Sequence, residues 1–425
     1  MASDAYGLPV TSGSPDALAA YDRAARGLLA WKADTLDLFQ RAVERDPALA
    51  LAHAGAAVCH FLEERFAEAR VAADAARAAV AAQTPREQSH VEALALWTSG
   101  KTDDAERVMR EHLARWPRDA VVLQRLYFVW FWQGKFPEML GLTTGLLPRY
   151  PDDSFVLGLH AFAVEEAGRC AEARRLAERA LALNADDAWS VHALAHALYE
   201  DTAFDPGVAR VPPAAEACVD LNWFRNHLAW HVALMHYAKG DAARASEIAR
   251  ATFEPKPSAI AGDLHDSISL FWRLELAGAP VGERWQPFTA IARERLTRFG
   301  LSFHVAHVAM ALAAGGDWAS ADRQAGLLRE RAPRDRSGLM GEVLLPLVEG
   351  LHAFGRGEYA TTIARLEPVA ARIVALGGSR AQRDVFHDTL LEACFRARDA
   401  ERARRLLAAR IARRPDPLWL ARAGR

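Results

Sequence analysis

Apolar residues recur along the chain at intervals of three and four positions, with polar residues between them. Ala69, Ala73 and Ala76 show this spacing. The same spacing recurs at Ala173, Leu176, Ala177 and Ala180. It places the apolar side chains on one face of an α-helix. The alternation of Val, Ile and Thr that is typical of strands is missing, and proline and glycine fall mostly between the periodic segments. The pattern therefore predicts an all-α protein.

Short turns interrupt the helical pattern at nearly constant intervals. The first four contain a basic residue at positions 65, 101, 135 and 169, which are 36, 34 and 34 residues apart. Glycine precedes the basic residue in the last three turns, and the first turn lacks it. Pro117 and Pro151, again 34 residues apart, end successive units. A helix–turn–helix unit with a period of 34 residues is the signature of the tetratricopeptide (TPR) repeat.

These repeats predict an α-α superhelix, a TPR-like solenoid in which each helix pair buries its apolar face against the next pair. We expect an N-terminal extension over residues 1–20 and regular repeats over residues 21–199. Later turns are more widely and less regularly spaced, which predicts longer, degenerate repeats over residues 215–425. Because a Pro-Pro pair and a Pro-Gly pair lie between the two halves, residues 200–214 are expected to form an interrupting loop.

The end of the chain is expected to form a cap on the last repeat. The predicted helix from Ala400 to Arg414 is very basic on one face, which suits a surface in contact with water. The segment from Pro415 to Trp419 would then fold back or contact a second subunit. The sequence therefore leaves open whether the protein forms a homodimer.

Composition and charge exclude several classes of protein. The 52 Lys and Arg residues against 54 Asp and Glu residues leave a formal charge of −2, which gives no basic surface for nucleic acid. No apolar run approaches the roughly 18 residues that a membrane span needs, and no secretory signal is visible. The four cysteines lie far apart without a CxxC pair, which favours a reducing cytoplasm over a disulfide framework. We expect a cytoplasmic protein that binds neither nucleic acid nor membrane.

Histidines at helical spacing interrupt the apolar faces near the middle of the chain. His192 and His196 are four residues apart, as are His227 and His231, so each pair shares one helix face. Two imidazoles at this spacing can bind one zinc or iron ion, although HxxxH without HExxH is not specific. A polar, histidine-lined cavity without metal is the interpretation that we favour, and a divalent metal is the alternative. These four histidines are candidate proton-transfer groups, with Asp266 as a base or as the group that orients a histidine.

A second set of polar residues lies on the predicted inner helices of the C-terminal half. Asp266 and Arg273 share a face amid apolar residues, so an ion pair between them or a bound ligand is expected. Arg380 and Arg383 begin a helix that Ser379 can cap, and they could bind a carboxylate or phosphate. The alternative is that these groups only connect neighbouring repeats. The candidate substrate-binding residues are Asn226, Ser269, Trp272, Arg273, His304, His307, Arg380, Gln382, Arg383 and Asp384.

Taken together, these motifs resemble the tetratricopeptide-repeat protein 38 family. The resemblance rests on HALAH at 192–196, Asn226-His227 with Trp230-His231, Asp266 with Ser269 and the WRLE string at 272–275, and AQRDVF at 381–386. It extends from about Tyr21 to the last repeat. It implies an all-helical repeat protein, cytosolic by default, and assigns no activity. Arg380 departs from the family pattern, which has histidine there, so ligand preference would differ if this position lines a pocket.

Two hypotheses about function follow. The first is a central polar, histidine-lined pocket for a small molecule, with an anionic molecule as one case and hydrolytic or lyase-type chemistry as one use of it. The second is a non-catalytic scaffold that binds peptide segments of other proteins in the concave groove. The concentration of His, Asp, Arg and Gln on successive C-terminal helices favours the pocket. Because no nucleotide-binding, HExxH or GxSxG motif is present, no reaction is assigned, and whether the protein is an enzyme stays open.

Overall fold

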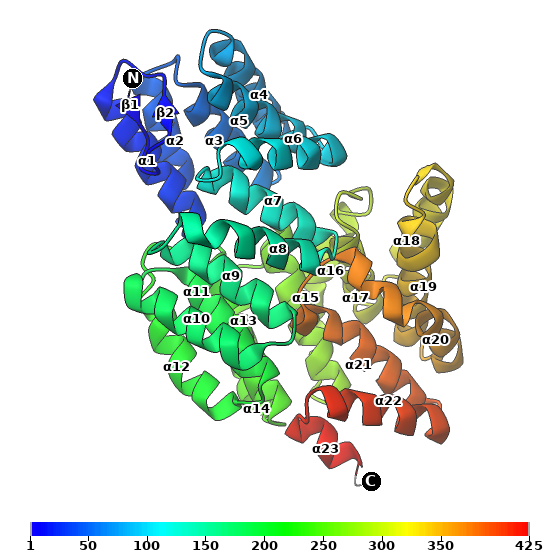
Figure 1. Ribbon diagram of the computed structural model, residues 1–425. Helices are drawn as coiled ribbons and strands as arrows, with labels where there is room; N and C mark the ends of the chain where they lie inside the picture. The colour runs from blue at the N-terminus through cyan, green and yellow to red at the C-terminus, as the bar shows by residue number, and fades with distance from the viewer. Residues whose placement is uncertain (1, 424–425) are drawn as a thin grey trace. The chain divides into compact units, whose positions relative to one another are not determined.

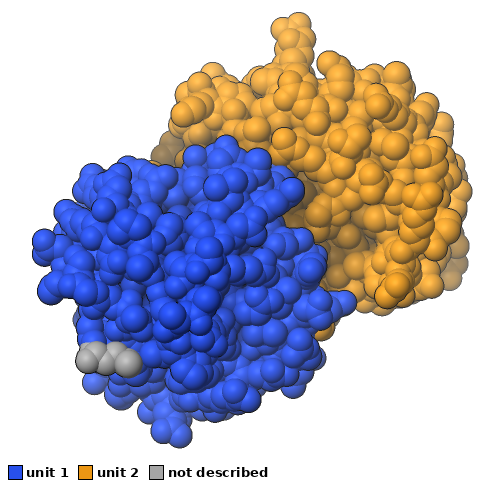
Figure 2. All heavy atoms as spheres, turned by 90° about the horizontal axis from the view of Figure 1, so that it is seen from above, with its two compact units in different colours: residues 1–130, 136–194, 214–224 blue, residues 131–135, 195–213, 225–425 orange. Residues whose placement is uncertain are grey.

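The computed structural model describes residues 2–423 and is almost entirely helical (Figure 1). This confirms the prediction of an all-α fold built from stacked helical hairpins, a TPR-like solenoid. The chain forms two compact units, coloured separately in Figure 2. The first unit comprises residues 2–130, 136–194 and 214–224, and the second comprises residues 131–135, 195–213 and 225–423. None of the helices described between residues 2 and 423 is both long and apolar enough to cross a lipid bilayer.

The first unit holds a short antiparallel strand pair and the N-terminal helices, including the first half of α11. Its elements are β1 (Ala2–Ser3), β2 (Pro9–Val10), α1 (Pro15–Leu29), α2 (Thr35–Arg45), α3 (Ala50–Leu62), α4 (Phe66–Val80), α5 (Pro85–Thr98), α6 (Thr102–Arg115), α7 (Ala120–Trp132), α8 (Phe136–Leu146), η1 (Leu147–Arg149), α9 (Ser154–Glu166), α10 (Cys170–Leu183) and α11 (Ala188–Glu200). Successive helices pair as antiparallel hairpins, for example α3 with α4 and α9 with α10.

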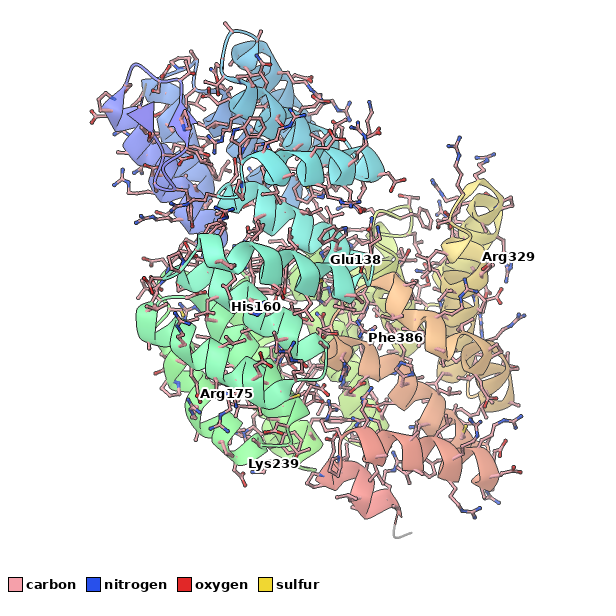
Figure 3. The ribbon with its side chains drawn as sticks, in the orientation of Figure 1. Glu138, His160, Arg175, Lys239, Arg329 and Phe386 are labelled. Carbon is pink, nitrogen blue, oxygen red and sulfur yellow. The ribbon has the colours of Figure 1, made fainter. Side chains whose placement is uncertain are left out.

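The second unit continues the hairpins with less regular connections. Its elements are α12 (Phe204–Glu216), α13 (Phe224–Ala238), α14 (Ala242–Phe253), α15 (Ala261–Leu276), η2 (Gly282–Trp285), α16 (Gln286–Glu294), α17 (Ser302–Ala314), α18 (Trp318–Arg331), η3 (Ala332–Arg334), η4 (Met340–Leu344), α19 (Leu345–Gly355), α20 (Tyr359–Leu366), η5 (Glu367–Leu376), α21 (Arg380–Arg396), α22 (Ala400–Arg413) and α23 (Pro417–Ala423). Its apolar faces point inwards: Phe386 of α21 is fully buried, whereas Arg329 of α18 projects into solvent (Figure 3).

The recurring turns take one backbone conformation. Gly100 has a φ of 76°, in the left-handed region that glycine reaches without strain, and so do the glycines of most later turns. In the first turn, which lacks glycine, Glu64 takes the same conformation with a φ of 59°. Thr202 and Arg398 do so as well, with φ values of 57° each. The turn therefore keeps its geometry even where another residue replaces glycine. That residue then takes the left-handed conformation, which has a steric cost for any residue with a Cβ atom.

The prediction of a loop over residues 200–214 is wrong, because α12 covers Phe204–Glu216. The buried residues Phe204, Gly207 and Val211 recur at helical spacing and face the core. A Cβ on Gly207 would overlap the Met235 sulfur, so this glycine lets two helices approach closely rather than breaking one. The Pro-Pro pair lies inside the helix beyond its first turn, so each proline removes one backbone hydrogen bond.

An aromatic cluster joins the ends of the first unit. The Trp31 ring stacks on Phe224 with centroids 4.5 Å apart, and its centroid lies 6.0 Å from that of Trp189. Backbone hydrogen bonds flank this contact: the amide of Ala33 donates to the carbonyl of Asp220 at 2.8 Å, and Asn222 donates to Trp31 at 3.0 Å. These contacts tie the segment after α1 to residues almost two hundred positions later.

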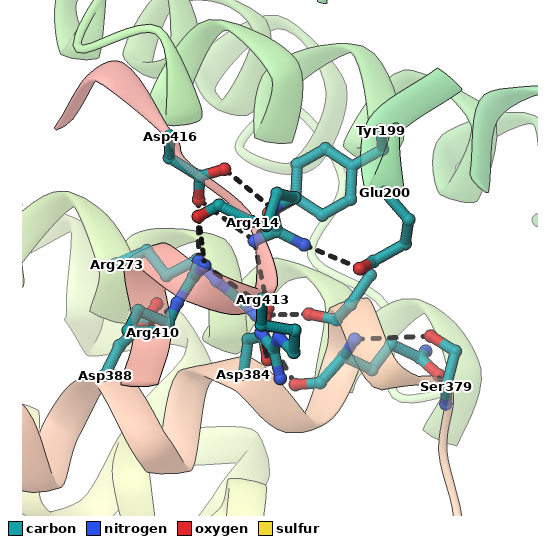
Figure 4. Close-up of polar contacts among 12 residues, drawn as sticks. Tyr199, Glu200, Arg273, Ser379, Asp384, Asp388, Arg410, Arg413, Arg414 and Asp416 are labelled. Carbon is teal, nitrogen blue, oxygen red and sulfur yellow. Dashed lines mark hydrogen bonds and ion pairs between the residues drawn. The ribbon is translucent and has the colours of Figure 1, made fainter. Parts of the chain in front are cut away.

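A buried ion-pair network joins the ends of the second unit (Figure 4). The Arg414 guanidinium donates to Glu200 at 2.6 Å, to Asp384 at 3.0 Å and to Asp416 at 2.7 Å. Arg410 donates to Asp416 at 2.7 Å. As expected, the basic side chains of Arg402, Arg404 and Arg405 on α22 are exposed. Arg410 and Arg414 differ from that expectation: they are buried because four acidic groups surround them. The chain folds back after α22, as expected, and Trp419 is fully buried.

Candidate functional site

The candidate site centres on Asp266, a fully buried residue of α15 that lies between two histidines. Nδ1 of His227, on α13, lies 2.6 Å from Oδ2 of Asp266. Nε2 of His265, the preceding residue on α15, lies 3.1 Å from Oδ1. The helices bring these groups together because α13 and α15 are first helices of successive hairpins, and equivalent positions on such helices lie side by side.

Imidazoles extend from Asp266 in one direction through α13 to α11. Nε2 of His227 lies 3.2 Å from Nε2 of His231, one helical turn along α13. The His231 ring is 4.5 Å, centroid to centroid, from the ring of His196 on α11. Both pairs are buried, and the Trp230 ring stacks on His227 at 5.4 Å with an interplanar angle of 13°. The i, i+4 spacing predicted in the sequence thus places His227 and His231 on one face.

Imidazoles also extend in the other direction, through α17 and α21. Nδ1 of His265 lies 3.0 Å from Nδ1 of His304. The amide nitrogen of Gln382 lies 2.9 Å from Nε2 of His265, and the backbone amide of Ser379 donates to the Gln382 oxygen at 2.9 Å. This second bond belongs to a capping box at the start of α21, so the predicted cap at Ser379 is confirmed. His307 lies beside His265, and its Nδ1 donates to the carbonyl of Phe303 at 2.8 Å.

Burial and neighbouring charges set the protonation of this network. Burial raises the pKa of Asp266, but His227 and His265 outweigh it and hold that pKa below its usual range. Burial and then the neighbouring imidazoles lower the pKa of His231 and His304 well below 6.5. Burial and His265 lower the pKa of His307 to about 3. An ionised carboxylate therefore lies in a network in which the imidazoles of His231, His304 and His307 are neutral.

Arg273 does not form the ion pair with Asp266 that we expected. It donates to the backbone carbonyl of Ala381 at 2.7 Å, because its position two turns along α15 faces α21 rather than Asp266. Trp272, beside it, donates to the Thr389 hydroxyl at 2.9 Å. Both residues therefore join α15 to α21 in the described structure.

The other candidate binding residues also contact groups of the second unit. The Ser269 hydroxyl accepts from the Trp230 indole at 3.1 Å, and Asn226 donates to Asp263 at 3.1 Å. Arg383 donates to the carbonyl of Gly378. Asp384 accepts from Arg413 and belongs to the Arg414 network. Arg380, at the start of α21, is partly exposed. No finding tests whether any of these residues binds a substrate, so their role stays a prediction.

His192 belongs to the first unit, although it shares α11 with His196. Its ring stacks on Phe162 with centroids 5.2 Å apart and lies 4.5 Å from the Trp189 ring. Its surroundings within the first unit are therefore aromatic.

Two hollows in the described part of the chain lie away from the Asp266 network. One is a surface groove of about 700 Å³ along α16 and at the turn between α17 and α18, lined by Trp285, Thr289, Ala290, Arg293 and Asp317 among others. The other, of about 10 Å³, lies beside Asp119 in the first unit and has room for about one water molecule. No described hollow shows the histidine-lined cavity that the sequence favoured.

Sequence reasoning missed a second buried cluster, around Asp119 in the first unit. Nδ1 of His90 lies 2.8 Å and Nε2 of His112 lies 3.1 Å from Oδ2 of Asp119. The Arg86 guanidinium donates to the same oxygen at 2.8 Å. Burial raises the pKa of Asp119, but His90 and Arg86 hold it well below its usual range. The available signal was the i, i+4 spacing of Arg86 and His90 on α5.

Comparisons with known proteins add the following. No family model matches the sequence. The chain is similar to a chain of the APC/C hetero-tetramer Cut9-Hcn1, with 14% identity and a TM-score of 0.38 over 88% of this chain and 76% of that one. It is also similar to the P58(IPK) TPR domain, with 13% identity and a TM-score of 0.21 over 91% and 99%. A third similarity is to MamA MSR-1 C2, with 18% identity and a TM-score of 0.29 over 40% and 95%. At these identities and scores the similarity says nothing about function.

Proposed function

We propose that the protein is a helical-repeat scaffold that binds a segment of another protein. The observation that carries this proposal is the internal use of the inner polar residues: His227 binds Asp266, and Arg273 and Trp272 bind α21. These residues hold helices together, and an accessible hollow lies elsewhere, at α16. The groove at α16 and α18 carries the exposed Arg293, which is ion-paired with Asp317, beside the exposed Ala290, so it suits a peptide with small and charged side chains.

Site-specific photo-crosslinking tests the scaffold. A photoreactive residue at Ala290, which is exposed in the groove, should capture a partner, whereas one at Val71, which is 72% exposed on α4, should not. The captured protein is then purified, and its binding to the parent chain is measured by calorimetry. We expect Ala290→Arg to weaken that binding at least tenfold and Val71→Ser to leave it unchanged. Equal binding by all three chains would contradict the groove as the binding surface.

The small-molecule hypothesis is a second proposal, and one observation favours it. A carboxylate that orients an imidazole, as Asp266 does with His227, is the arrangement of a general base. Thermal unfolding with carboxylate and phosphate metabolites tests it. A compound that raises the Tm of the parent but not of a folded His231→Gln variant supports it, and one that raises both equally contradicts it. No reaction type follows from the contacts described here.

The finer assignment to the tetratricopeptide-repeat protein 38 family stays a proposal. The motifs that suggested it fall on α11, α13, α15 and α21, and those of the last three make the contacts around Asp266. The cytoplasmic location, the homodimer and the expected boundaries of the repeat regions likewise stay predictions.

A further inference from the structure

Arg125, on α7 of the first unit, is a buried guanidinium without a carboxylate partner. Its side chain is 2% exposed, and no Asp or Glu forms an ion pair with it among residues 2–423. Burial lowers the pKa of Arg125 to about 10, so the group is still charged near neutral pH. The neighbouring Cys59 thiol does not balance this charge, because burial raises its pKa to about 12. A buried charge is costly unless an opposite charge accompanies it.

Other buried arginines of the chain have the acceptors that Arg125 lacks. Arg86 and Arg414 each form ion pairs with at least two carboxylates, and Arg273 donates to backbone carbonyls. In Arg125, Nη2 donates to the amide oxygen of Gln124 at 2.5 Å, whereas Nε is buried and makes no hydrogen bond within the described part of the chain. The guanidinium therefore has a donor left for a further acceptor.

Two aromatic rings from neighbouring hairpins flank this guanidinium. The Cζ atom of Arg125 lies 5.6 Å from the ring centroid of Trp97, on α5, and 5.3 Å from that of Phe128, on α7. An aromatic ring attracts a cation but has no net charge. These contacts hold the guanidinium in place without neutralising it.

More hydrogen-bond donors lie next to Phe128. Its ring contacts those of Trp31 and Trp189, with centroids 5.6 Å and 5.0 Å away. The Nε1 atoms of both indoles are buried, and no described residue accepts a hydrogen bond from them. Together with Nε of Arg125, three such donors border one ring. Because buried polar groups are normally hydrogen-bonded, this excess of donors favours a ligand that supplies acceptors.

The guanidinium lies close to the surface of the first unit. Trp97 is partly exposed, and so is Phe61 on α3, whose ring centroid lies 4.6 Å from that of Trp97. An apolar molecule can pack on these rings while its polar end reaches Arg125. A carboxylate suits that end, because it is planar, matches the donors of a guanidinium and carries the single negative charge that one arginine requires.

We propose that Arg125, Trp97 and Phe128 form a binding site for a small carboxylic acid with an apolar body. The carboxylate accepts from the Arg125 guanidinium, and the apolar body packs against the aromatic rings. This site is separate from the Asp266 network, and the inference does not depend on the proposed scaffold function.

Thermal unfolding with benzoate and benzamide tests the site, since the two molecules have nearly the same shape and only benzoate is charged. All samples are brought to one ionic strength with NaCl. At a Kd of about 1 mM, about 10 mM benzoate should raise the Tm of the parent by about 2–4 °C, and benzamide by less than about 1 °C. Equal shifts, or no shift with benzoate, would overturn the proposal.

A tripeptide that ends in phenylalanine with a free carboxylate distinguishes a small acid from the end of a protein chain. We expect a smaller Tm shift with this peptide than with benzoate, because Arg125 lies beneath partly exposed rings. A shift with the peptide and none with benzoate would overturn the proposal in favour of a protein ligand.

The variant Arg125→Met removes the charge and keeps a side chain of similar length. It should lose the benzoate shift, while its Tm without benzoate should equal or exceed that of the parent, because an unpaired buried charge is gone. The matched control is Arg107→Met on α6, since Arg107 is exposed and pairs with Glu111. It should keep the full shift. Retention of the full shift by Arg125→Met would overturn the proposal.

Hydrogen exchange of the parent locates the bound benzoate without any variant. Benzoate should slow amide exchange in α5 and α7 more than in α17 and α19, because Trp97 and Arg125 lie on the first pair. This measurement decides the matter even if Arg125→Met does not fold. Unchanged exchange in α5 and α7 would overturn the proposal.

Discussion

Each unit buries one aspartate between two histidines, yet the two clusters balance its charge differently. Asp119 in the first unit lies 2.8 Å from His90 and 3.1 Å from His112, and Asp266 in the second lies 2.6 Å and 3.1 Å from its two histidines. Asp119 also has Arg86 at 2.8 Å, whereas no arginine pairs with Asp266 in the described residues. Because a guanidinium is always charged, Arg86 gives Asp119 a permanent positive partner.

The comparison shows what an arginine does to a histidine–aspartate cluster. With Arg86 present, the imidazoles need only supply hydrogen bonds, and the cluster serves to hold α5, α6 and α7 together. Without one, Asp266 has only the imidazoles of His227 and His265 as partners. The second cluster therefore lacks the permanent positive charge that the first one has.

The largest expected effect comes from removing the two carboxylates. Asp119→Asn would leave the Arg86 guanidinium buried with only Asp4 to pair with it, which should cost about 3–5 kcal/mol. Asp266→Asn leaves only imidazoles, which can become neutral, and should cost about 1–3 kcal/mol. Hydrogen exchange of amides in α5 and α7, and in α13 and α15, measures each loss locally. Equal losses would remove the distinction between the clusters.

Acid should destabilise the second unit before the first. Burial lowers the pKa of His352 and of His387 to about 4, and of His307 to about 3, against an ordinary 6.5. The unfolded chain then takes up protons below about pH 6.5 and the folded chain does not. Each histidine's contribution is fully present above that pH and falls by up to about 1.4 kcal/mol per pH unit as pH drops towards the folded value.

Hydrogen exchange, corrected for the intrinsic effect of pH on exchange rates, should therefore show protection of α17, α19 and α21 falling between about pH 6.5 and 4.5, with smaller changes in α3, α5 and α7. In the first unit, His90 is the fully buried histidine whose pKa is lowered. Simultaneous loss of protection in both units would mean that buried neutral histidines do not dominate the acid response.

The smallest effects come from two serines that support the clusters. Ser269→Ala removes the acceptor of the buried Trp230 indole and should cost about 1 kcal/mol. Ser89→Ala removes the 3.0 Å contact with His112, but Ser89 is half-buried and water can replace it, so less than about 1 kcal/mol is expected. Thermal unfolding of the two variants measures both. A larger loss for Ser89→Ala would contradict this ranking.

The sequence predicted the fold well because the repeat signal is local. Apolar spacing and the 34-residue turn interval specify helices and hairpins, and Glu64 shows that even a turn without glycine keeps the geometry. The exception was α12, where a Pro-Pro pair indicated a loop although Phe204, Gly207 and Val211 supply a buried helical face. Packing outweighed the local preference of proline there.

The candidate site was predictable in part. The i, i+4 spacing placed His227 and His231 on one face, because that depends on one helix only. Contacts between helices depend on how successive hairpins stack, so the partner of Arg273 was wrong: it binds the carbonyl of Ala381, 108 residues away. The Asp119 cluster was missed for the same reason, since its members come from α5, α6 and the residue before α7.

The Arg414 network also affects the order in which the chain can fold during its synthesis. The first unit has all its residues once position 224 has left the ribosome, whereas the second lacks Arg414 and Trp419 until nearly two hundred further residues are made. Domains fold as units as they emerge. The first unit can therefore fold before the second unit is complete. Glu200 and Asp384 have no Arg414 to pair with until the last residues of the chain have been made.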